Sequence, residues 1–192
     1  DRVLPGEDAD AAQVVEKVFR ARGMTVQSRS RAESVVRTDH GVAVRLSDGT
    51  VLEGSHCLLA VGSLPNTESL GLDSAGVEMS PHGYVQVDGV SRTNVRGIYA
   101  AGDCTGVLLL ASVAAMQGRI AMWHALGDAV EPLRLDTVSS NVFTDPEIAT
   151  VGVTQADVES GDVTAETVLL PLATNARAKM QGITEGFVKL YA

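Results

Sequence analysis

The sequence predicts an α/β fold, and three stretches of its 192 residues support this prediction. Residues 98–101 are a short apolar run that ends at Gly102 and Asp103, as expected of a buried strand with a carboxylate at its tip. An alanine-rich stretch then runs from residue 111 to 126 and stops at Gly127, which favours a helix. Residues 1–61 and 137–192 each combine a helix-forming segment with several strand-forming segments.

The order strand, acidic tip, loop and helix over residues 98–127 indicates a cofactor site. In open parallel sheets, extended cofactors lie at this corner, because a helix N-terminus offers free N–H groups and a partial positive charge. A plainer interpretation is a buried strand whose aspartate helps to cap a loop.

The stretch from Thr93 to Asp103, with the pattern T-x4-I-Y-A-A-G-D, resembles the second FAD-binding motif of the pyridine nucleotide–disulfide oxidoreductases, the class I flavoprotein disulfide reductases. The resemblance implies that Asp103 accepts hydrogen bonds from the ribityl chain of FAD. It also implies that a helix N-terminus faces the flavin pyrimidine ring. The backbone N–H groups at this helix N-terminus belong to Leu109, Leu110, Ala111 and Ser112.

Composition and charge argue against several other functions. The formal net charge is −9 and no cluster of Lys or Arg occurs, which is unfavourable for a nucleic-acid surface. No apolar run approaches the roughly 20 residues that span a bilayer, and no basic-then-apolar leader opens the chain. Cys57 and Cys104 are expected to be buried thiols in a reducing, cytoplasmic compartment. Without a C-x-x-C or His/Cys cluster, no metal site is predicted.

Residues 1–61 are expected to be the second half of an NAD(P)-binding domain. Asp8 is a plausible helix N-cap and Gly23 a helix stop. The following strands are expected at residues 24–27, 35–37, 42–46, 50–53 and 56–61, the last of them fully buried. This order is similar to that of the NAD(P) domain in the resembled family. The resemblance places the backbone of Ala32 against the adenosine end of the nicotinamide nucleotide.

Residues 62–136 are expected to be the second segment of the FAD-binding domain, with a further strand at 84–87. The run A-V-G-S-L-P-N-T at residues 60–67 resembles the family's A-x-G-R-x-P-N-T crossover between the two nucleotide-binding domains. The resemblance implies that Gly62 lies beside the nicotinamide. Ser63 stands where the family usually has Arg, so a fixed positive charge near the dinucleotide is missing. The preference for NADH or NADPH is therefore left open.

Residues 137–192 are expected to begin a C-terminal interface, or dimerisation, domain. Strands are expected at residues 137–143, 148–153, 163–170 and 187–191, with a short helix capped by Thr154 and Asp157. The apolar face of this sheet predicts a homodimer. Arg177 and Lys179 lie in an N-x-R-A segment that we interpret as a solvated basic loop. No catalytic residue is assigned.

The resemblance implies two Rossmann-like, three-layered FAD- and NAD(P)-binding domains plus an α+β dimerisation domain. This chain is expected to be an internal portion, because it opens inside a pattern and lacks a G-x-G-x-x-G loop. The implied activity is that of an FAD-dependent oxidoreductase, which passes a hydride from NAD(P)H through the flavin to a second acceptor.

The identity of the electron acceptor depends on residues that members of the family carry near their N- and C-termini. Disulfide-reducing members use a cysteine pair near the N-terminus and a partner-subunit His-Glu pair near the C-terminus, and neither is in these 192 residues. The chain resembles most the lipoamide-dehydrogenase-like NAD(P)H:quinone reductases of actinobacteria, so a quinone is the expected acceptor. The alternatives are a dihydrolipoamide dehydrogenase or related disulfide reductase, and a flavin-binding protein without turnover.

Overall fold

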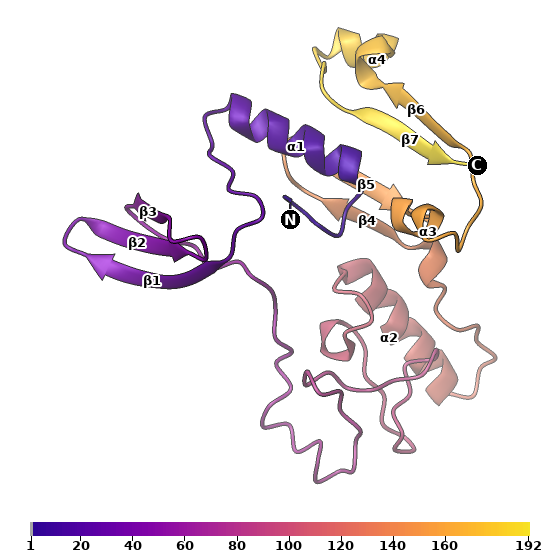
Figure 1. The fold of residues 1–192 in the computed structure, drawn as a ribbon. Helices are drawn as coiled ribbons and strands as arrows, with labels where there is room; N and C mark the ends of the chain where they lie inside the picture. Colours follow the sequence, from indigo (N-terminus) through magenta and orange to yellow (C-terminus); the bar gives the residue numbers. More distant parts are fainter. Residues whose placement is uncertain (1) are drawn as a thin grey trace. The chain divides into compact units, whose positions relative to one another are not determined.

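A computed structural model describes residues 2–192 and divides the chain into two compact units (Figure 1). One unit combines residues 1–60 with residues 141–192, and the other spans residues 61–140. The division into an NAD(P) segment, an FAD segment and a dimerisation segment stays a prediction. No helix within residues 2–192 has both the length and the apolar composition required to cross a bilayer.

Helix α1 (Ala9–Ala21) begins and ends where its capping residues predict. The Asp8 carboxylate accepts hydrogen bonds from the N–H groups of Asp10 and Ala11 at 2.9 and 3.2 Å, which satisfies two donors that the first turn leaves free. At the other end Gly23 adopts a positive φ of +87°. The sequence expectation for this helix is confirmed.

Three antiparallel strands follow: β1 (Ala32–Thr38), β2 (Gly41–Leu46) and β3 (Val51–Gly54), in the order β1-β2-β3 (Figure 1). Gly41 has a φ of +152°, and a Cβ at this position would collide with the carbonyl group of Gly54. The Asp48 carboxylate accepts a hydrogen bond from Thr50 N–H at 2.9 Å and stabilises the turn from β2 into β3. The predicted meander is confirmed.

Two strands predicted within residues 1–61 are wrong. Residues 24–27 and 56–61 form no strand, and the second segment is exposed rather than buried: Leu58 is 89% and Val61 94% exposed. A strand is stable only where a neighbour accepts and donates its backbone hydrogen bonds. Within residues 2–192 the strands pair among themselves and none lies alongside these two runs.

Residues 139–192 contain two strand pairs, two short α-helices and a 3-10 helix at Leu172–Thr174. Strands β4 (Ser139–Val142) and β5 (Ile148–Val151) form one sheet, and β6 (Thr167–Pro171) pairs antiparallel with β7 (Phe187–Tyr191) in another. Helix α3 (Gln155–Glu159) has the predicted capping box, with Thr154 and Asp157 each accepting from the other's backbone N–H. The expected basic loop is instead a short helix, α4 (Ala176–Met180), which Asn175 caps.

One ion cluster connects the start of α1 with β7. The Nζ of Lys189 lies 2.8 Å from Asp8 Oδ2 and 2.7 Å from Asp10 Oδ2. The hydroxyl of Tyr191 donates to Asp8 Oδ2 at 2.8 Å. Only 10% of the Lys189 side chain is exposed, so these groups interact largely away from water.

The cluster shifts the ionisation of its members. Burial alone raises the pKa of Asp8, but the hydrogen bonds from Lys189, Tyr191 and Ala11 N–H outweigh it and hold this pKa below its ordinary value. Burial alone lowers the pKa of Lys189, but its hydrogen bonds to Asp10 and Asp8 raise this pKa well above the usual range. Both shifts favour the charged pair.

The second unit is built around helix α2 (Ala111–Ala125), as expected. Its buried face carries Val113, Gln117, Ile120 and Ala121. The predicted strands at 84–87 and 98–101 are wrong, because each is reduced to one isolated bridge, Met79 with Val85 and Arg92 with Tyr99. The backbone groups of these runs pair with turns instead of neighbouring strands, as in the bond from Val85 N–H to Cys104 O at 2.9 Å.

Candidate cofactor-binding site

A tight turn at residues 102–105 presents Asp103 beside α2. Thr105 closes the turn with two hydrogen bonds to Gly102 O, one from its N–H at 2.9 Å and one from its hydroxyl at 2.8 Å. Gly102 has a φ of +89°, and a Cβ there would lie 3.2 Å from Ala114 Cβ on the helix. A glycine therefore allows both the backbone conformation and the close approach of the turn to α2.

The end of the turn is held on its other side by Tyr84. Gly106 has a φ of +67°, and a Cβ at this position would lie 2.7 Å from the Tyr84 ring. The neighbouring Val85 N–H donates to the carbonyl oxygen of Cys104, which lies within the turn. The turn is thus confined between the helix and the segment around Tyr84.

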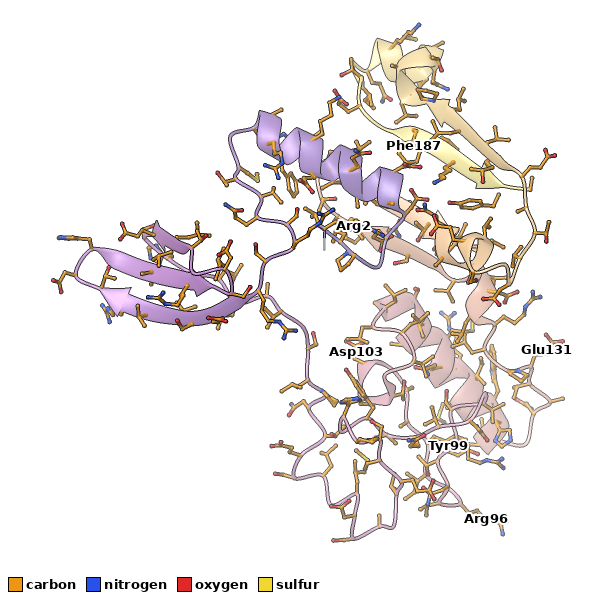
Figure 2. All side chains as sticks on the ribbon, viewed as in Figure 1. Arg2, Arg96, Tyr99, Asp103, Glu131 and Phe187 are labelled. Carbon is orange, nitrogen blue, oxygen red and sulfur yellow. The ribbon has the colours of Figure 1, made fainter. Side chains whose placement is uncertain are left out.

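Asp103 itself is exposed on this turn (Figure 2). Among residues 2–192, its carboxylate has no hydrogen-bonding or ion-pairing partner. An ionised carboxylate accepts hydrogen bonds only, so Asp103 is available to hydroxyl groups of a ligand. This placement is compatible with the predicted binding of a ribityl chain.

The N-terminus of α2 is the second part of the site. Its N-cap is Leu110, whose backbone is extended and whose side chain cannot accept a hydrogen bond. The N–H groups of Ala111 and Ser112 in the first turn therefore have no side-chain cap, and they contribute to the positive end of the helix dipole. An extended ligand with electronegative atoms fits such an end.

Two of the predicted flavin residues contribute differently from Ala111 and Ser112. The N–H of Leu110 already donates to Leu108 O at 2.9 Å within the loop, so this donor is engaged. The side chain of Leu109 is 47% exposed and offers apolar surface next to the helix. All four predicted residues nevertheless lie in one segment beside the turn that carries Asp103.

Gln117 is the residue that the sequence interpretation missed. Only 2% of it is exposed, and its side-chain Oε1 accepts the N–H of Gly102 at 2.8 Å. Its Nε2 donates to Thr105 Oγ1 at 3.3 Å. A signal for it exists in the sequence, because Gln117 interrupts the apolar stripe of α2 between Val113 and Ile120.

A groove of about 530 Å³ runs along α2 within the same unit. It starts at Ser112, one of the predicted flavin residues, and passes Trp123, which is 47% exposed. His124 does not line it: its Nδ1 lies 2.8 Å from the hydroxyl of Tyr99, the residue labelled in Figure 2. The lining residues are Ser112, Val113, Met116, Ile120, Trp123, Ala129, Val130, Glu131, Pro132, Leu133, Arg134, Thr137, Val138 and Ser139.

The two residues predicted to contact NAD(P) are exposed and lie in different units. Ala32 is the first residue of β1 and pairs with Leu46. Gly62 has a φ of +140°, and no heavy atom lies within 4 Å of the position a Cβ would take. Their role in binding a nicotinamide nucleotide stays a prediction.

The prediction of two buried thiols is wrong. Cys57 is exposed, because the strand expected to bury it does not form. Cys104 is half-buried, and its Sγ lies 3.5 Å from the carbonyl oxygen of Ala101. In the part of the chain that the structure describes, no group of three or more His, Cys, Asp or Glu side chains is arranged to hold a metal ion.

Two sequence profiles of one family match the chain. The profile of the pyridine nucleotide-disulphide oxidoreductases matches residues 1–118, and that of the dimerisation domain of the same family matches residues 138–192. Among curated relatives, the NAD(P)H dehydrogenase (quinone) of Mycobacterium tuberculosis is 58% identical over 191 residues. That alignment covers the whole of this chain and 39% of the relative.

More distant relatives and solved structures indicate the same family. The dihydrolipoyl dehydrogenase of Zymomonas mobilis is 34% identical, over 98% of this chain and 41% of that protein. The crystal structure of LpdA from M. tuberculosis superposes with a TM-score of 0.90 at 57% identity, covering 97% of this chain and 40% of that one. The flavoprotein disulfide reductase RclA of Escherichia coli superposes with a TM-score of 0.88 at 28% identity, covering 98% and 43%.

The fold is therefore that of the flavoprotein disulfide reductases, with α/β nucleotide-binding parts and an α+β dimerisation part. The chain belongs to the pyridine nucleotide–disulfide oxidoreductase family. This family uses FAD and NAD(P)H. The chain spans about two-fifths of the length of the curated relatives it matches.

Proposed function

We propose that this chain acts in an FAD-dependent oxidoreductase that passes a hydride from NAD(P)H through the flavin to a quinone. The observation that carries the proposal is the combination of a free carboxylate, Asp103, with the uncapped N-terminus of α2. The turn is hydrogen-bonded to the helix, from Gly102 N–H to Gln117 Oε1 at 2.8 Å, so the two features are held beside one another.

In this proposal Asp103 binds FAD by accepting hydrogen bonds from the ribityl hydroxyl groups. The bound flavin supplies the redox chemistry, by accepting a hydride and returning two electrons to the second substrate. The N–H groups of Ala111 and Ser112 would hold the pyrimidine part of the flavin and would stabilise negative charge that develops on it. The chain thus contributes binding, orientation and electrostatic stabilisation.

The NAD(P) side of the proposal involves Gly62 and Ala32. The open space around Gly62 lets a planar ring approach the backbone closely. The backbone at Ala32, the exposed first residue of β1, is the proposed contact of the adenosine end of NAD(P). Ser63 adds no positive charge at this point of the chain.

A quinone is the proposed acceptor because the relative that is 58% identical is an NAD(P)H dehydrogenase (quinone). The second candidate is a dihydrolipoyl dehydrogenase, which the relatives at 34% and 36% identity favour. Cys57 and Cys104 are both free thiols, so the described residues contain no disulfide that favours this second candidate.

Anaerobic stopped-flow spectroscopy of the full-length protein tests this function. We expect NADH or NADPH to bleach the visible absorbance of the flavin, and a benzoquinone to restore it faster than lipoamide does. The double variant Cys57→Ala/Cys104→Ala is the control and is expected to turn over quinone within a few-fold of the parent. A flavin that no nicotinamide nucleotide bleaches would instead indicate a binding protein without turnover, and faster reoxidation by lipoamide would favour the second candidate.

We also propose that the protein is a homodimer assembled through residues 137–192. The dimerisation-domain profile matches this part of the chain. On β6 and β7, four apolar side chains share one face of the hairpin and are each 46–58% exposed: Val168, Leu170, Val188 and Leu190. An apolar sheet face of this kind requires cover, and obligate dimers bury on the order of 2,000 Å² or more.

Light scattering of the full-length protein at low micromolar concentration is expected to give the mass of a dimer. The variant Val168→Glu/Leu190→Glu places two charges on the face and is expected to give a monomer or a weakened dimer, whereas Lys179→Glu on exposed α4 is the control and should stay dimeric. A monomeric parent at this concentration would rule out the dimer.

A further inference from the structure

We propose that Gln117 is the positioning residue of the flavin site: its buried amide fixes the Gly102–Thr105 turn to α2 and so sets the position of Asp103. The inference rests on the proposed FAD function and concerns how the chain builds that site. Gln117 does not face the ligand itself, because only 2% of it is exposed and its polar atoms are directed at the turn.

The hydrogen-bond partners determine the orientation of the Gln117 amide. Gly102 N–H is a donor, so the side-chain atom 2.8 Å from it is the oxygen. The nitrogen then lies 3.3 Å from Thr105 Oγ1, whose proton is directed at Gly102 O at 2.8 Å. One amide therefore satisfies a backbone donor at the start of the turn and a hydroxyl acceptor at its end.

The turn depends on this arrangement because of its backbone conformation. Gly102, with a φ of +89° and a ψ of −160°, lies in a region that glycine alone occupies readily, and its buried N–H points into the helix. Without the amide oxygen, this N–H would have to find water or shift toward another acceptor. Asp103 follows directly in the chain, so a shift of Gly102 moves the carboxylate relative to the N-terminus of α2.

A purely structural role for Gln117 predicts a different experimental result. A buried polar residue that only fills the core affects the free energy of unfolding but leaves the properties of a bound ligand unchanged in the folded molecules. A positioning role changes the affinity for FAD and the surroundings of the flavin in protein that is fully folded. The two roles are therefore separable by measuring binding and spectroscopy beside stability.

The experiment uses full-length apoprotein titrated with FAD, followed by flavin fluorescence and by visible circular dichroism of the bound flavin. Gln117→Leu keeps the size and removes both hydrogen bonds, and we expect it to weaken FAD binding about tenfold and to alter the dichroism. Gln117→Glu keeps an acceptor for Gly102 N–H and is expected to bind within a few-fold of the parent. Ala121→Gly, at a buried position on the same helix that does not line the groove, controls for lost stability and should retain the parental affinity and dichroism in its folded fraction.

The outcomes separate this inference from the proposed function. A parent protein without affinity for FAD contradicts the proposed function. A parent that binds FAD, together with a folded Gln117→Leu variant of equal affinity and unchanged dichroism, contradicts the role of Gln117 alone. If Gln117→Leu does not fold, Gln117→Glu decides: rescue of folding and binding supports the role, and a folded Gln117→Glu variant that binds FAD no better than Asp103→Ala overturns it.

Discussion

Replacing Asp103 with alanine is expected to lower the affinity for FAD ten- to hundredfold. The substitution removes a charge-assisted hydrogen bond to the ribityl chain, worth about 1.5–3 kcal/mol. Asp103 has no partner within residues 2–192, so its loss leaves the fold of the turn intact. Titration of the full-length apoprotein with FAD measures the dissociation constant directly, and the variant should also purify with less bound flavin.

Asp128→Ala is a matched control for this result. Asp128 is also exposed and lies in the same unit, but it follows the C-terminal end of α2, away from the turn. Its substitution should leave the affinity for FAD unchanged. If Asp103→Ala binds FAD as tightly as Asp128→Ala does, the assignment of Asp103 to the ribityl chain is wrong.

Replacing Lys189 with methionine is expected to lower the free energy of unfolding by about 2–4 kcal/mol. Removing one partner of a buried ion pair costs about 3–5 kcal/mol, because the other charge remains without compensation. Here the cost is reduced since Asp10 is 49% exposed and can be hydrated, whereas Asp8 is 13% exposed and cannot. Urea denaturation of the full-length protein measures the change.

The variant Lys17→Met provides the comparison. Lys17 also connects α1 with the β7 side of the unit, through an ion pair with Glu185 at 3.0 Å, but its side chain is 69% exposed. Exposed ion pairs contribute about 0–1 kcal/mol, so this variant should be close to the parent in stability. Equal losses in the two lysine variants would mean that burial of the Lys189 cluster has no energetic importance.

The stability that the cluster contributes has a defined pH window. The pKa of Asp8 is lowered in the folded state, so its contribution is complete above the ordinary value of 3.8 and is lost as the pH falls through the folded pKa. The pKa of Lys189 is raised, so its contribution is complete below the ordinary value of 10.5 and is lost as the pH rises through the folded pKa. The difference between parent and Lys189→Met should be constant near neutral pH and shrink in acid, because burial without Lys189 raises the pKa of Asp8 in the variant above that in the parent.

The helices and the meander were predictable because their signals are local. Asp8 and Gly23 delimit α1, Gly127 follows α2, and the turns between β1, β2 and β3 contain glycine or aspartate. The apolar runs at 24–27, 56–61, 84–87 and 98–101 predicted strands that do not form. An apolar run indicates what a segment buries but not whether a partner strand lies beside it, and that depends on distant parts of the fold.

The candidate site was predictable only in part for the same reason. Asp103 and the segment from Leu109 to Ser112 follow from a pattern along the chain. Gln117 acts through Gly102, which precedes it by 15 residues, and this contact exists only once the turn packs on α2. The hydrogen bond from Leu110 N–H to Leu108 O is a similar case. It depends on the local backbone conformation, which the residue types do not specify.

The contact between Lys189 and Asp8 closes a loop of 181 residues. Closing so long a loop has a large entropic cost, so contacts of this sequence separation form late, after the intervening chain has become ordered. Interactions absent from the folding transition state mainly determine the rate of unfolding. We therefore expect the cluster to slow the unfolding of this unit and to have little effect on its folding rate.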